Sequence, residues 1–215
     1  MAQVFPESSN RAAVALAVGG LVAATLAIGV VWYYFSPRYT DVGFAPKQPV
    51  PYSHRLHVGT LGLDCKYCHA SVERSAVANV PPTQVCMNCH SLVKRDSALL
   101  APIRASYATG QPMQWVRVHN LPDFAFFHHA VHVRAGVGCV ECHGRIDEMD
   151  VVTQAEPLSM SWCLDCHRDP APHLRPTEQV TNMRWQAPAD QRRAGERIIA
   201  EKHLAPPLDC SGCHR

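Results

Sequence analysis

Five copies of the pattern Cys-x-x-Cys-His contain all ten cysteines of this 215-residue chain. The copies are Cys65, Cys68 and His69; Cys86, Cys89 and His90; Cys139, Cys142 and His143; Cys163, Cys166 and His167; and Cys210, Cys213 and His214. This spacing is typical of c-type haem attachment, in which each thiol forms a thioether with a haem vinyl group and the histidine becomes an axial iron ligand. Five copies with no cysteine left over predict five covalently bound haem c groups and an electron-transfer role.

Other chemistries of cysteine fit this pattern poorly. Structural zinc takes four ligands, so all-cysteine sites would pair the CxxC units and leave one of five over. A disulfide framework gives no reason for a histidine after every second cysteine, and thioredoxin-like CxxC motifs sit in a strand-to-helix setting that this sequence does not show. A catalytic multihaem reductase, acting for example on nitrite, would keep one axial position open. All five motifs end in histidine, which disfavours that class.

Eight histidines remain outside the motifs, 13 in total minus five. An internal repeat, aromatic-x-His-x-x-His, precedes the first and third motifs, and a single histidine precedes the fifth at the spacing seen before the third. The repeat selects five sixth ligands, His54, His57, His129, His132 and His203. Residues at i and i+3 share a helix face, and each iron already has one motif histidine, so the two members of a pair must serve different haems.

The other histidines and the methionines complete this prediction. His119, His128 and His173 are expected to be non-ligands, with His128 the alternative to the adjacent His129. Met113, Met149 or Met183 is the alternative to any one predicted histidine. Residues 190–204 are predicted to form the helix that carries His203 to the fifth haem. No catalytic residue is expected on this chain.

The region that carries the motifs is too short for an ordinary hydrophobic core. Residues 51–215 supply 165 residues for five motifs, or 33 for each haem. We therefore predict a mainly α fold with long irregular loops wrapped around haem. Its expected parts are two-haem modules at 51–110 and 111–170, followed by a connecting wrap and a single-haem unit at 171–215.

A charge-free run at residues 12–35 is long enough to cross a bilayer, since about 20 residues suffice for a helix. Its end carries Trp32, Tyr33, Tyr34 and Phe35, and aromatic rings favour the membrane interface. A cleaved secretion signal would have a shorter apolar region, of about 7 to 15 residues. We expect a single, uncleaved transmembrane helix.

The orientation of this anchor follows from haem chemistry. Covalent c-haem attachment takes place on the outer side of the bacterial inner membrane, so residues 1–11 are expected in the cytoplasm and the haem region in the periplasm, after a linker at 36–50. The positive-inside rule mildly favours the opposite orientation, because Arg11 precedes the helix while Arg38 and Lys47 follow it. Long segments, however, translocate largely regardless of charge.

The anchor, the motif order and the phrases at 120–127, 138–144 and 160–168 resemble the pentahaem cytochrome c subunit (ActA) of alternative complex III over nearly the whole chain. The haem phrases alone also resemble cytochromes of the c3 and c7 kinds. This resemblance implies a c3/c7-like head in a quinol:electron-acceptor oxidoreductase. In the c7 kind the second histidine of each pair serves the next haem in sequence, which implies His57 for the first haem and His132 for the third.

The same resemblance implies partners. Quinol would be oxidised in NrfD-like membrane subunits, beside an iron–sulfur subunit and a monohaem cytochrome c subunit. The electrons would pass to a soluble cytochrome, a copper protein or an oxidase. The alternative is a stand-alone membrane quinol dehydrogenase of the NapC/NrfH kind, which shares the single helix but usually carries four haems and needs a quinol site on the chain. No nucleic-acid partner is expected.

Overall fold

The structure, a computed structural model, describes residues 4–6 and 8–214. The chain divides into two compact units, Met1–Asp41 and Val42–Arg215. The first unit contains α1 (Ser8–Tyr34) and the short α2 (Pro37–Thr40). By length and composition α1 can cross a membrane. The helix begins four residues earlier than the predicted span at 12–35, and it ends one residue earlier than that span does. This helix is therefore a candidate membrane anchor.

Aromatic rings gather at the C-terminal end of α1. The ring of Tyr34 lies 5.4 Å from that of Tyr33 and 4.6 Å from that of Tyr39, which belongs to α2. Amphipathic aromatic rings favour the level of the lipid headgroups. Their position at one end of the apolar helix fits an anchor that reaches a membrane surface there.

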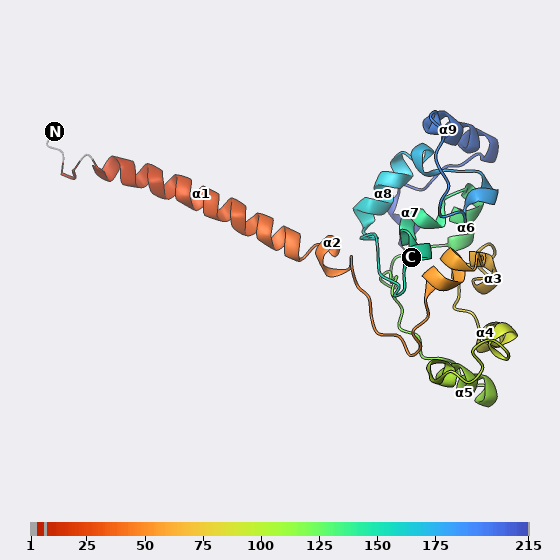
Figure 1. Cartoon of the computed structure of the whole chain (residues 1–215). Helices are drawn as coiled ribbons and strands as arrows, with labels where there is room; N and C mark the ends of the chain where they lie inside the picture. Colours follow the sequence, from red (N-terminus) through yellow and green to blue (C-terminus); the bar gives the residue numbers. More distant parts are fainter. Residues whose placement is uncertain (1–3, 7, 215) are drawn as a thin grey trace. The chain divides into compact units, whose positions relative to one another are not determined.

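The second unit consists of short helices joined by long irregular segments (Figure 1). The helices are η1 (Arg55–Thr60), α3 (Cys65–Cys68), α4 (Thr83–His90), η2 (Ala98–Leu100), α5 (Ala101–Thr109), α6 (His129–Ala135), α7 (Cys139–His143), η3 (Ile146–Glu148), α8 (Met160–Arg168), η4 (Ala171–His173), η5 (Thr177–Gln179), α9 (Gln191–Lys202) and α10 (Cys210–Cys213). The described residues form no strand, only the isolated bridges Ala125–His214 and Val137–Leu174. The predicted mainly α fold is confirmed.

Few apolar side chains are buried in this unit. The buried hydrophobic residues are Val50, Ile103, Ala130, Val133, Ala171, Leu174, Val180 and Met183. Most of them belong to α6 or to the segment from η4 to Met183, and Ile103 belongs to α5. The side chains alone bury little apolar surface, as the short length per motif predicts.

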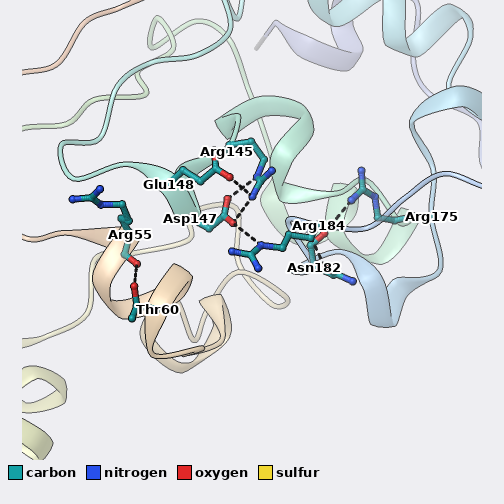
Figure 2. Close-up of polar contacts among 8 residues, drawn as sticks. All are labelled: Arg55, Thr60, Arg145, Asp147, Glu148, Arg175, Asn182 and Arg184. Carbon is teal, nitrogen blue, oxygen red and sulfur yellow. Dashed lines mark hydrogen bonds and ion pairs between the residues drawn. The ribbon is translucent and has the colours of Figure 1, made fainter.

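Ion pairs gather around Asp147 in the segment that follows the third motif, as Figure 2 shows. The carboxylate of Asp147, only 4% exposed, accepts two hydrogen bonds of 2.8 Å from Arg145 and lies 3.9 Å from Arg184. Arg145 also pairs with Glu148 at 2.6 Å. The backbone carbonyl of Asp147 contacts Gly59 so closely that a Cβ would not fit there. The histidine-bearing η1 is thus held against η3.

Helix α9 packs on η4 through a glycine. Gly195 is buried, and a Cβ at this position would collide with the backbone carbonyl of Ala171. The side chain of Gln191 secures the same contact by donating a 2.6 Å hydrogen bond to the carbonyl oxygen of Leu174. The predicted helix at 190–204 is present, and its buried face is the one that meets η4.

The substitution Gly195→Ala should destabilise the second unit by about 2 kcal/mol, since an added methyl group must push a backbone carbonyl away. The gain in helix propensity from glycine to alanine, about 1 kcal/mol, is smaller. Thermal unfolding of the haem-loaded chain measures the change. Glu196→Ala, at the exposed neighbouring position, should stay within about 0.5 kcal/mol of the parent. An unchanged or raised melting temperature for Gly195→Ala would show that α9 does not pack this tightly.

Candidate haem-binding site

Each Cys-x-x-Cys-His motif lies on a short helix. The motifs occupy α3, α4, α7, α8 and α10, with the histidine within one residue of the helix end. The two cysteines of a motif are three positions apart, so on a helix both thiols point to one side. Asp64 and Asp209 cap α3 and α10 by accepting hydrogen bonds from Lys66 N and Gly212 N. All ten cysteines are free thiols, as attachment to haem vinyl groups requires.

The motif histidines are oriented by backbone carbonyls. In four of the five, Nδ1 lies within hydrogen-bond distance of a carbonyl oxygen: His69 with Asn79 at 2.6 Å, His90 with Val93 at 2.9 Å, His167 with Pro207 at 2.9 Å and His214 with Phe124 at 3.1 Å. An Nδ1–H that donates to a carbonyl fixes the tautomer and leaves Nε2 for a metal. This arrangement fits an axial haem ligand.

Three of the spare histidines face motif histidines. Their ring centroids are 6.2 Å apart for His57 and His90, 6.1 Å for His132 and His167, and 6.5 Å for His129 and His143. Two imidazoles on opposite faces of one metal ion, each with a metal–nitrogen bond of about 2 Å, have centroids about 6 Å apart. The three gaps therefore have the width that an iron between two histidines needs.

The three facing histidines have the same backbone orientation as the motif histidines. The Nδ1 atoms of His57, His132 and His129 lie 2.8, 2.9 and 2.8 Å from the carbonyl oxygens of Ser53, His128 and Ala76. Tyr52 stacks on the ring of His57 at 4.4 Å, and Phe127 lies 4.5 Å from that of His132. The aromatic residue of the repeat thus supports the ring of the second histidine.

This geometry differs from one expectation. The resemblance to c7 cytochromes assigned His57 to the first haem and His132 to the third. In the structure His57 faces His90 of the second motif, and His132 faces His167 of the fourth. The spacing along the chain could not show which motif each histidine faces. On α6, for example, His129 faces the third motif while His132 faces the fourth.

A cavity of about 580 Å³ lies among the first, third and fourth motifs. It is lined by cysteines of all three motifs and by His54, His69, His119, His129 and His143. Burial lowers the pKa of His143 to about 3, and burial followed by the neighbouring His69 lowers that of His54 to about 4. These imidazoles are therefore neutral, which is the form that binds a metal. The residues present fit haem.

Two histidines outside the prediction also reach this region. His119 lies in the cavity with a buried Nε2 that has no hydrogen-bond partner, and its ring centroid is 4.3 Å from that of His143. That distance is too short for two ligands across one iron. His128 has a buried Nδ1 without a hydrogen-bond partner. His119 stands outside the repeat, whereas His128 occupies its variable position beside His129.

The structure leaves two predicted ligands without a facing motif ring. His54 lines the cavity near His69, but no ring pairing between the two is described. His203 is exposed at the C-terminal end of α9, in a left-handed conformation with φ of 51°. Within residues 4–6 and 8–214, no described contact joins His203 to the fifth motif. Both remain predictions.

A buried arginine holds the third motif. Arg175, with a side chain 4% exposed, pairs with Glu141 at 2.6 Å and lies 4.5 Å from the ring of Trp185. Its guanidinium fills the space where a Cβ of Gly138 would be. His173 also contacts Glu141 at 3.0 Å, and this hydrogen bond raises the pKa of His173. Burial alone would raise the pKa of Glu141, but these two partners hold it below its usual range.

Comparisons with known proteins agree with this site. A model of the cytochrome c552 family matches residues 105–207, slightly less than half of the chain, which include the third and fourth motifs. The multihaem cytochrome c subunit of menaquinone reductase from Nitratidesulfovibrio vulgaris is 32% identical over 138 residues, covering 64% of this chain. The match spans 63% of that relative, which is less than two thirds of its length.

Together, the motifs, the facing histidines and these similarities define the class. They are the features of multihaem c-type cytochromes, in which the cysteines of such motifs attach haem c covalently. Its apolar α1 is consistent with association with a membrane.

Breaking the buried pair at the third motif should destabilise the protein. Arg175→Met leaves Glu141 without its cation in a largely buried place, and we expect a loss of about 3 kcal/mol. The double variant Arg175→Met/Glu141→Gln removes both charges and should recover part of that loss. Thermal unfolding of the three haem-loaded proteins measures both changes.

The matched control is Arg168→Met. Arg168 pairs with Asp165, which occupies the same position in the fourth motif, but these side chains are 61% and 77% exposed. An exposed pair contributes little, so the control should change stability by less than about 1 kcal/mol. Equal losses for Arg175→Met and Arg168→Met would contradict a special role for burial.

Proposed function

We propose that this chain is a membrane-anchored, five-haem electron-transfer subunit of a quinone- or quinol-linked oxidoreductase. The observation that supports this most directly is the facing of spare and motif histidines across gaps of 6.1 to 6.5 Å. With histidine on both sides, an iron has no open position for a substrate. The chain then serves to conduct electrons.

The proposed attachment residues are the ten cysteines of the five motifs, with His69, His90, His143, His167 and His214 as the motif-side axial ligands. The facing ligands are His129 for the third haem, His57 for the second and His132 for the fourth. By the repeat, His54 occupies the position equivalent to His129 and serves the first haem. His203 remains the predicted ligand of the fifth.

Haem c, when bound, supplies a one-electron iron couple, and two histidine ligands give lower potentials than histidine with methionine. The chain contributes position, burial and ligand orientation. Carbonyl acceptors at Nδ1 hold the three facing imidazoles and four of the motif imidazoles in the tautomer that presents Nε2. Histidines on both sides of a metal position would leave no place on it for water or small molecules.

Partners and placement follow from the anchor and the similarities. We propose that α1 crosses the bacterial inner membrane with the motif-bearing unit in the periplasm. There the unit would accept electrons from quinol-oxidising NrfD-like subunits and an iron–sulfur subunit, as in alternative complex III. It would pass them to a monohaem cytochrome c or a soluble acceptor. The two-haem modules at 51–110 and 111–170 and the terminal unit at 171–215 remain the proposed internal division.

The similarity to a menaquinone reductase subunit favours a second candidate function, that of an electron-transfer subunit in a quinone-reducing complex. A subunit of such an enzyme would carry electrons toward the quinone pool. Histidine pairing and covalent haem suit either direction, because the chain's residues do not fix the relative potentials of its partners. A stand-alone NapC/NrfH-like dehydrogenase is the remaining alternative, and it would require a quinol site on this chain.

The substitution His132→Ala should leave five covalent haems and create one high-spin iron that binds carbon monoxide, because the fourth haem loses one axial ligand. Haem content is counted by intact mass, and the spin state is read from the electron paramagnetic resonance and visible spectra of the full chain. His173→Ala is the control, since His173 pairs with Glu141 and is a predicted non-ligand. Its spectrum should remain low-spin. An unchanged spectrum for His132→Ala would remove His132 from the ligand set.

The native mass of the haem-stained species from gently solubilised membranes tests the proposed function. On that species, quinol oxidation and quinone reduction are both assayed. We expect a large assembly that carries one of the two activities. Quinol oxidation would support an alternative complex III, and quinone reduction would support a menaquinone reductase. A chain that runs alone and still has its haems reduced by quinol would support the stand-alone dehydrogenase. Intact mass showing fewer than five haems would overturn the five-haem proposal.

A further inference from the structure

Contacts between motifs that are far apart in sequence place them in a defined spatial order. The first and second motifs meet through the residues inside them. Asn88, the third residue of the second motif, donates a 3.2 Å hydrogen bond from Nδ2 to the hydroxyl of Tyr67, the third residue of the first motif. The haem sites of α3 and α4 are therefore neighbours.

The first motif also meets the third. Thr181 Oγ1 donates a 2.9 Å hydrogen bond to Asp64 Oδ2, the cap of α3, and the adjacent Val180 carbonyl accepts a 2.9 Å bond from Cys139 N. The thiols of Cys65 and Cys139 contact each other. Both motifs line the same cavity. The first site therefore lies between the second and the third.

Helix α6 joins the third motif to the fourth. His129 and His132 stand one turn apart on this helix, and they face His143 of the third motif and His167 of the fourth. Side chains three residues apart on a helix lie side by side, so the two haem sites that they complete are adjacent.

The fourth motif meets the segment that leads into the fifth. The carbonyl oxygen of Pro207 lies 2.9 Å from His167 Nδ1, and the ring of Pro207 packs against Gly212 inside the fifth motif, where a Cβ would not fit. Among the hydrogen bonds described for residues 4–6 and 8–214, none joins α4 to α7, α8 or α10.

Exposure of the cysteines agrees with this order. Of the ten, only Cys89 of the second motif and Cys210 of the fifth are exposed. Figure 1 shows α4 at the edge of its unit, with α7 in the middle. The second and fifth motifs thus have the solvent access of ends, whereas the third is enclosed.

We propose that the five haem sites form one unbranched row in the order second, first, third, fourth, fifth, with the second and fifth sites at its ends. This proposal rests on the proposed five-haem function and deepens it. The row does not follow the order of motifs along the chain, because the second motif lies on the side of the first motif that is away from the third. Redox partners of this chain would approach α4 at one end and α10 at the other, since the cysteines of the sites between them are less exposed.

Electron cryo-microscopy of the haem-loaded full chain in its membrane assembly tests the order. Each porphyrin is assigned to a motif through its two thioether bonds. The shortest iron–iron distances should join the second and first, first and third, third and fourth, and fourth and fifth haems. The longest should separate the second and fifth. A second haem closer to the third than to the first, or a fifth haem beside the first, would overturn the proposal.

Two matched variants label the ends independently. Cys86→Ala/Cys89→Ala and Cys210→Ala/Cys213→Ala each remove one attachment site, and the missing porphyrin should come from opposite ends of an otherwise continuous row. A gap inside the row in either variant would overturn the order. Five haems in another order would defeat this proposal while leaving the five-haem function intact. Fewer than five in the unsubstituted chain would defeat the function itself.

Discussion

The pairing of histidines across a gap that matches one metal ion is the interaction on which the rest of this structure depends. Each facing pair joins segments that are distant in sequence, such as η1 with α4 and α6 with α8. In these pairs every ring except that of His143 has a backbone carbonyl at its Nδ1, which orients the ring before any metal is bound. With so few buried apolar side chains, the fold gains much of its long-range order from these pairs and from what they hold between them.

Buried charge serves the same purpose at the third motif. Arg175 costs desolvation energy, which only a close anion and an aromatic face can offset. Glu141 supplies the anion from within the motif, and Trp185 supplies the face. The pair thereby fixes α7, whose cysteines line the cavity, to the segment that follows η4. The exposed pair at Asp165 and Arg168 provides no comparable restraint.

Much of this site could be predicted from the sequence, since the chemistry of Cys-x-x-Cys-His is local. The motif residues, the apolar anchor and the shortage of core all follow from spacing and composition. The repeat also selected His57, His129 and His132, which the structure places opposite motif histidines. It could not give the partners of His57 and His132, because these depend on how α4 and α8 return to η1 and α6. Nor could it reveal the burial of His119 and Arg175, which arises from loops without any periodic pattern.

The contrast between an enclosed middle and accessible ends has a physical consequence for electron transfer. Transfer falls off steeply with distance, so a partner must come close to a haem edge to exchange an electron. If every site were equally accessible, an electron could leave to any passing oxidant. In the proposed row, α6, α7 and the Arg175–Glu141 pair cover the third site. Electron exchange with partners would then take place at the exposed second and fifth sites. The deep burial of His143 and the exposure of Cys89 and Cys210 are two aspects of this one arrangement. The core of this chain is small, and its buried contacts lie around the middle of the proposed row. Electrons would therefore enter and leave at the two ends of the row.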